Sequence, residues 1–280
     1  MFSALIRALR TPWGVVELFI LGNVAFLAAD VYIAHSTNAF ERPEEWIPVV
    51  FSLTAPVLLL GVAALSRSRP HAARTLALVV GWTSLLVGVA GMLFHLQSHF
   101  FEEQTMRNLV YTAPFVAPLA YAGLGLLLIL DRMVDSESME WAQWIVFLAL
   151  GGFAGNFVLS LADHAQNGFF NRMEWAPVAA SALAIGFLLV VVVQPANVQL
   201  RIVTWWLLAL QVLIGVAGSA YHLHANMRQT TASLWDRFVY GAPIFAPLLF
   251  ANLAILAAIG LWAMRRSNPL GPRPGSPVRS

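Results

Sequence analysis

Residues 35–48 read HSTNAFERPEEWIP, and residues 164–177 read HAQNGFFNRMEWAP. Both stretches contain H-x-x-N-x-F followed by E-W-x-P, with no gap between the two parts of the alignment. Each stretch follows one apolar segment of helical length and opens the next, so we expect a polar turn between two helices. This repetition predicts that the chain is built twice from one unit.

The repeat extends beyond these two turns. GVAG at 88–91 recurs at 215–218, HL at 95–96 recurs at 222–223, and Y-x-A-P-x-x-A-P-L at 111–119 recurs at 240–248. We therefore predict a tandem duplication of a four-helix unit. Four helices return the chain to its starting side, so both copies enter the membrane in the same sense. Their pseudo-two-fold axis would run along the membrane normal.

The composition places the chain in a lipid bilayer. It is 59% hydrophobic and 11% charged, with a mean hydropathy of +0.72, whereas a soluble domain carries roughly 25% charged residues. The fold class expected is an all-α integral membrane protein with eight transmembrane helices. The predicted spans are 13–34, 47–66, 75–96, 110–130, 142–161, 176–194, 202–223 and 238–262.

These spans divide the chain into a first membrane unit at 1–131 and a second at 132–266. The tail at 267–280 is rich in Pro, Gly, Ser and Arg, and we expect it to be disordered and cytoplasmic. Outside this tail, nine arginines fall on the side of the termini and five on the other side. This bias predicts that both termini are cytoplasmic in the cell (inner) membrane.

Missing residue types exclude several kinds of chemistry. The chain has no cysteine, so disulfides, thiolate metal sites and iron–sulfur clusters are excluded. All sixteen basic residues are arginine, which excludes a lysine Schiff base. The net charge is only +2, and no nucleic-acid partner is expected. The expected partners are the bilayer and, as an open possibility, other membrane subunits.

The small residues and prolines of the repeat have a structural interpretation. GVAG in the third helix of each unit is typical of close helix packing. The paired prolines of Y-x-A-P-x-x-A-P fall early in the predicted fourth helix. We expect them to kink that helix and to leave backbone carbonyls that need other partners.

Six of the seven histidines fall on the predicted outer side, and the repeat selects among them. The matched acids and histidines are His35 with His164, His95 with His222, and Glu45 with Glu174. His99 and His224 have no histidine at the aligned position. Asp30 aligns with Leu159, so that acid is present in one copy only.

Two imidazoles and one carboxylate are a ligand set typical of Zn, Fe or Mn. Each unit supplies such a set from three neighbouring helix ends, and we predict metal ligation by His35, Glu45, His95, His164, Glu174 and His222. We predict that four further residues line the cofactor site or orient the ligands: Asn38, Asn167, Tyr111 and Tyr240.

Other interpretations stay open at this point. Interfacial His, Glu and Trp often serve only as helix caps and membrane anchors. Two histidines could hold a haem, with room for the ring beside Gly91 and Gly218. An electron-transfer or structural subunit and a small-solute transporter are further alternatives, although only Glu17 and Asp30 are deep charges in the first half. Catalysis is undecided; metal-assisted chemistry on a lipid-soluble or periplasmic substrate would fit the site.

Overall fold

The computed structural model describes residues 9–230 and 233–267, and its regular elements there are all helices. The long helices are α2 (Pro12–Ser36), α3 (Trp46–Leu65), α4 (Pro70–Leu96), α6 (Leu119–Met133), α7 (Met139–Gln166), α8 (Trp175–Val193), α9 (Val198–Met227) and α11 (Leu248–Arg266). The short elements are η1 (Pro43–Glu45), α5 (Met106–Tyr111), η2 (Arg172–Glu174) and α10 (Leu234–Val239).

Seven of the described helices are long and apolar enough to cross a membrane, namely all the long ones except α6. The prediction of an all-α polytopic membrane protein is therefore confirmed. Helix α6 has 15 residues, about 22 Å at 1.5 Å per residue, whereas the hydrocarbon core is about 30 Å thick. By itself α6 is too short to cross. The disorder predicted for the tail falls on residues 268–280, outside the described part of the chain.

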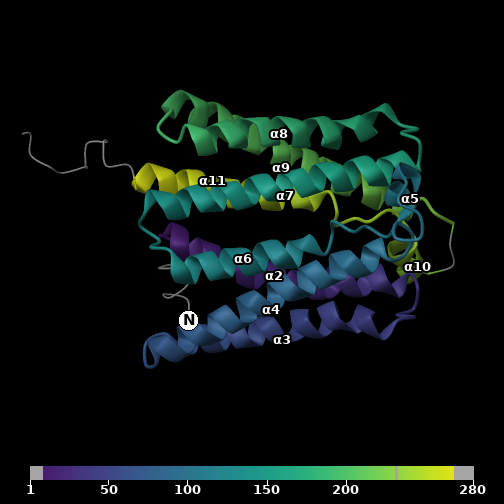
Figure 1. The fold of residues 1–280 in the computed structure, drawn as a ribbon. Helices are drawn as coiled ribbons and strands as arrows, with labels where there is room; N and C mark the ends of the chain where they lie inside the picture. Colours follow the sequence, from purple (N-terminus) through teal and green to yellow (C-terminus); the bar gives the residue numbers. More distant parts are fainter. Residues whose placement is uncertain (1–8, 231–232, 268–280) are drawn as a thin grey trace, which may run out of the picture.

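The long helices run roughly parallel in one bundle (Figure 1). α3 and α4 lie at one edge of the bundle and α8 and α9 at the other, with α2, α6, α7 and α11 between them. Most of the largest fully buried side chains belong to these central helices, among them Ile20, Leu127, Trp141, Phe153 and Phe250. The short helices α5 and α10 lie at the end of the bundle away from the start of α2 (Figure 1). This end carries both repeated turns, and we refer to it as the turn end.

The prediction that the paired prolines kink a helix is wrong. Pro114 lies in an irregular segment at 112–118, and Pro118 is the residue that precedes the first turn of α6. Pro247 holds the same position before α11. Each helix begins only after both prolines because proline lacks the N–H that a helix interior requires. The freed carbonyl of Pro114 does find another partner, as predicted: the side chain of His95.

The glycines of GVAG lie where two helices come into close contact. A Cβ on Gly88 would lie 2.5 Å from the backbone nitrogen of Ala122 in α6. A Cβ on Gly215 would lie 2.8 Å from the carbonyl oxygen of Pro247 at the start of α11. Only a residue without a side chain allows this approach, so the packing interpretation of GVAG is confirmed.

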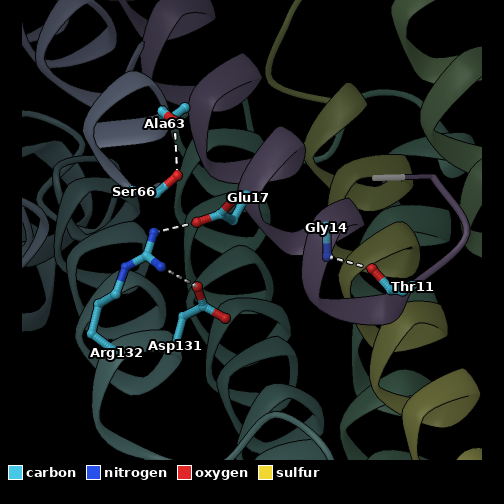
Figure 2. A network of polar contacts seen from close by, with 7 residues as sticks. All are labelled: Thr11, Gly14, Glu17, Ala63, Ser66, Asp131 and Arg132. Atoms are coloured by element: carbon cyan, nitrogen blue, oxygen red, sulfur yellow. Dashed lines mark hydrogen bonds and ion pairs between the residues drawn. The ribbon is translucent and has the colours of Figure 1, made fainter. Parts of the chain in front are cut away.

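A buried charge cluster lies at the other end of the bundle (Figure 2). Arg132 forms an ion pair with Glu17 of α2, and its second guanidinium nitrogen lies 3.8 Å from Asp131. Asp131 is 6% exposed, and neither carboxylate oxygen has a hydrogen-bond partner among the described residues. Glu17, one of the two deep charges in the first half of the sequence, therefore has an ion-pair partner in Arg132.

Candidate functional site

The first repeated turn brings a histidine and a glutamate together. His35 lies in the last turn of α2, and Glu45 ends the short helix η1. Their Nδ1 and Oε2 atoms are 3.7 Å apart, beyond ordinary hydrogen-bond length. Glu45 is nine-tenths buried, and Oε2 has no hydrogen-bond partner in the described chain. A buried carboxylate oxygen without a partner is costly, so its position calls for an explanation.

Asn38 holds the other oxygen of this carboxylate. Its side-chain amide donates to Glu45 Oε1 at 2.8 Å. This contact fits the orienting role predicted for Asn38, since it fixes the carboxylate without using Oε2. The aligned Asn167 behaves differently, because its amide reaches the carbonyl of Asp163 at 3.5 Å.

The backbone of the turn ends helix α2 and then reverses. The amide of Phe40 donates to the carbonyl of His35 at 3.3 Å, and Ala39 has a φ of 56°, the geometry of a Schellman helix end. Phe40 itself has a φ of 54°, a left-handed conformation that is strained for a bulky residue. Its ring stacks on Trp46, with centroids 4.2 Å apart. Stacking on Trp46 therefore holds Phe40 in its strained conformation, five residues after His35.

His95, in the last turn of α4, is the third predicted ligand of the first half. We refer to His35, Glu45 and His95 as the first set. Nδ1 of His95 donates to the carbonyl of Pro114 at 2.9 Å. A carbonyl oxygen can only accept, so Nδ1 carries the proton, and in the neutral ring Nε2 then keeps its lone pair. A metal-binding histidine usually has this arrangement, with the other ring nitrogen held by a backbone carbonyl. The rings of His95 and His35 have centroids 6.1 Å apart.

The second repeated turn reproduces most of this geometry. His164 Nδ1 lies 3.7 Å from Glu174 Oε2, which again has no hydrogen-bond partner among the described residues. His222 Nδ1 donates to the carbonyl of Pro243 at 2.8 Å. The ring of Phe169 stacks on Trp175 at 4.1 Å.

A cavity of about 630 Å³ lies beside the first set. His35, Asn38, Glu45 and His95 all line it. One wall comes from α2 and a second from α4. Further lining comes from the turn and the start of α3, from the irregular segment at 113–118 with Tyr121, and from the other half of the chain, which contributes Phe238, Val239, Gly241, Pro243, Ile244 and Phe245. The first set therefore faces a common space.

Six of the ten predicted site residues do not line this cavity: the four in the second half, His164, Asn167, Glu174 and His222, and the two tyrosines; two other lining residues were not predicted. Tyr111 is 53% exposed and Tyr240 is 67% exposed, and neither lines the cavity. Tyr121 and Asp30 do line it, and the hydroxyl of Tyr121 lies 2.6 Å from Ser52 Oγ. The repeat could not find them, because their aligned residues are Phe250 and Leu159. The intramembrane position of Asp30 was the available signal.

The predicted ligands of the first half, His35, Glu45 and His95, lie near one another but are not close enough to share a metal ion in the present conformation. No group of three His, Asp or Glu side chains within residues 9–230 and 233–267 is close enough to hold an ion. Two imidazoles on one zinc ion have ring centres roughly 5 Å apart, since each Zn–N bond is about 2.0 Å. His35 and His95, at 6.1 Å, would need to approach by about an ångström.

The two repeated glycines considered for a haem site each pack against a proline. A Cβ on Gly91 would lie 2.8 Å from Cβ of Pro118, and one on Gly218 would lie 2.8 Å from Cβ of Pro247. Each glycine therefore allows a proline to pack closely, and Gly91 also lines the cavity of about 630 Å³.

Comparisons with family models, with curated proteins and with solved structures find no match to this chain. The fold defines it as a polytopic all-α membrane protein.

Proposed function

We propose that the protein binds a divalent metal ion, zinc, iron or manganese, at the mouth of the cavity. The ligands are His35 and His95 through imidazole nitrogens and Glu45 through Oε2. The observation that carries the proposal is Glu45 Oε2: it is buried, it has no hydrogen-bond partner in the described chain, and it lies 3.7 Å from His35 Nδ1. A cation would neutralise this carboxylate and use the free Nε2 of His95.

A second, pseudo-equivalent site uses His164, Glu174 and His222. We infer that the chain is a tandem duplication of a four-helix unit, with α6 and the irregular segment before it completing the eighth crossing. Both inferences are supported by matched contacts, namely the equal His–Glu separations and the two histidine–proline hydrogen bonds. The arginine bias supports placing both sites on the outer face of the inner membrane.

Metal content of the purified protein tests the proposal. After loading with zinc and gel filtration, elemental analysis should find up to two ions per wild-type chain. Glu45→Gln should remove one ion and Glu174→Gln the other. This substitution keeps the shape of the side chain and the bond from Asn38 while removing the charged ligand.

His71→Ala is the matched control, because His71 lies at the other end of the bundle, at the start of α4. It should bind as much metal as the wild type. Adding His95→Ala and His222→Ala to one chain should abolish binding. If the Glu45→Gln, Glu174→Gln double variant and the double histidine variant both hold as much zinc as the wild type, the proposal is wrong.

A further inference from the structure

The cavity beside His35 is larger than a metal ion requires. On α2 its lining runs from His35 down to Leu27, a distance of about 12 Å along the helix axis. Its volume of about 630 Å³ lies within the range of roughly 300–1,000 Å³ that is typical of small-molecule pockets. A metal ion at the mouth would leave most of this space for another molecule.

The charges that line the cavity are mainly negative. The carboxylates are Asp30, Glu41, Glu44 and Glu45, and the only arginine in the lining is Arg42. Arg42 is an exposed residue at the start of η1, on the loop that forms the mouth. The deeper part of the lining therefore contains one carboxylate, Asp30, and no arginine, and this favours a positively charged occupant.

Asp30 is the deepest of these carboxylates. It lies six residues before the end of α2, about 9 Å into the membrane-spanning helix. No hydrogen bond or ion pair within the described residues holds its carboxylate, in contrast to Glu17 of the same helix, which pairs with Arg132. An intramembrane carboxylate without a protein partner is expensive and usually marks a ligand or ion site.

Aromatic side chains contribute to the lining of the cavity that contains Asp30. Phe94, Tyr121, Phe238 and Phe245 line the same cavity. Ring faces attract cations, and quaternary ammonium groups are recognised in this way. Aliphatic side chains, among them Leu27, Val31, Val87 and Ile244, supply apolar surface for the rest of a ligand.

We propose that this cavity binds an organic cation, a quaternary ammonium or similar ion with apolar substituents. The positive charge lies beside Asp30, and the substituents pack on the aromatic and aliphatic walls. The inference does not depend on the metal proposal, because Asp30 belongs to neither proposed set of metal ligands. It also predicts one such pocket per chain, since the residue aligned with Asp30 is Leu159.

Equilibrium dialysis of the purified, detergent-solubilised protein with radiolabelled tetraphenylphosphonium tests the proposal, with protein-free micelles as the blank. Wild type should bind one cation per chain in a saturable manner. Asp30→Asn, which keeps the side-chain shape, should weaken binding roughly tenfold or more, since an unscreened opposite charge is worth most in a low-dielectric pocket. Tetraphenylborate has the same shape and the opposite charge, and it should not bind saturably.

Asp163→Asn is the matched control. Asp163 is an acid at the turn end of α7, outside this cavity, and its replacement should leave binding unchanged. Ala90→Phe is a second test that changes no charge: Ala90 lines the cavity, and a larger side chain there should also reduce binding.

Three results would overturn the inference: no saturable binding by wild type, equal affinity in Asp30→Asn, or equal affinity for tetraphenylborate. Zinc content is measured on the same preparations, so loss of cation binding with zinc retained, or the reverse, separates this inference from the metal proposal.

Discussion

The two halves of the chain share their repeated turns but differ in the space beside them. His–Glu separations are 3.7 Å in both halves, and the stacked Phe–Trp pairs are 4.2 and 4.1 Å apart. In the first half, α2 and residues 238–245 enclose part of a cavity of about 630 Å³. The corresponding stretch of the second half, α7 with residues 109–116, lines a cavity of only about 10 Å³.

One pair of positions offers a physical reason for this difference. Phe26 of α2 contacts Phe245 edge-on, with ring centroids 4.9 Å apart. The aligned residues at the other interface are Gly155 and Val116, and a Cβ on Gly155 would lie 3.0 Å from Val116 Cγ1. Two large rings keep the chain segments apart, whereas a glycine and a valine let them approach. Positions that are the same in both halves therefore determine the turn geometry, whereas positions that differ determine the size of the cavity.

The largest effect is expected at the charge cluster, which the second half lacks. The positions aligned with Glu17, Asp131 and Arg132 hold valine, glycine and leucine. Arg132→Leu alone leaves two carboxylates without a partner at a largely buried site (Figure 2). We expect a loss of about 3–5 kcal/mol in unfolding free energy, measured by thermal unfolding in detergent.

The triple variant Glu17→Val, Asp131→Gly, Arg132→Leu provides the control, because it gives the first half the residues of the second. It removes the charges together and should recover most of the lost stability. A triple variant less stable than Arg132→Leu would show that the cluster stabilises the bundle in its own right.

A smaller effect is expected from exchanging the aromatic pair. Phe26→Ala with Phe245→Val should lower the unfolding free energy by about 1–2 kcal/mol, through loss of an edge-on pair and its partly buried area. It should also let the two segments approach and so weaken tetraphenylphosphonium binding. Thermal unfolding and dialysis on one preparation measure both. Wild-type affinity in this variant would mean that the ring pair does not set the width of the cavity.

Sequence reasoning succeeded where local physics decides the structure. Apolar runs near twenty residues specify membrane helices, and the glycines of GVAG specify close contacts such as that of Gly88 with Ala122. It was wrong about the paired prolines because a helical run was extended through Pro114 and Pro118 on hydropathy alone. Proline chemistry places the helix start after them.

The site was harder to predict for a different reason. The predicted ligands are those residues that both halves of the sequence have at aligned positions. His35, Glu45 and His95 meet this condition, and they do line one cavity. The same condition excluded Asp30 and Tyr121, because their aligned residues are apolar. A condition of this kind finds what two copies share and misses what distinguishes them. Exposure of Tyr111 depends on where α5 ends relative to the irregular segment, which hydropathy does not report.

The smallest effect, and the most direct comparison of the halves, concerns the residue after the helix end in each turn. Ala39 and Gly168 are aligned, and both are left-handed, with φ of 56° and 69°. This conformation costs an alanine about 1 kcal/mol more than a glycine. Ala39→Gly should therefore stabilise the protein by about 1 kcal/mol, and Gly168→Ala should destabilise it by a similar amount.

Thermal unfolding of both single variants and the double variant in one detergent checks this prediction. A Cβ on Gly168 would meet no described atom within 4 Å, so its effect reports backbone conformation and not a clash. The two sites lie in different turns, and their effects should add, leaving the double variant within a few tenths of a kcal/mol of wild type. If both single variants shifted stability in the same direction, the two turns would not share the left-handed helix end that the alignment of the halves requires.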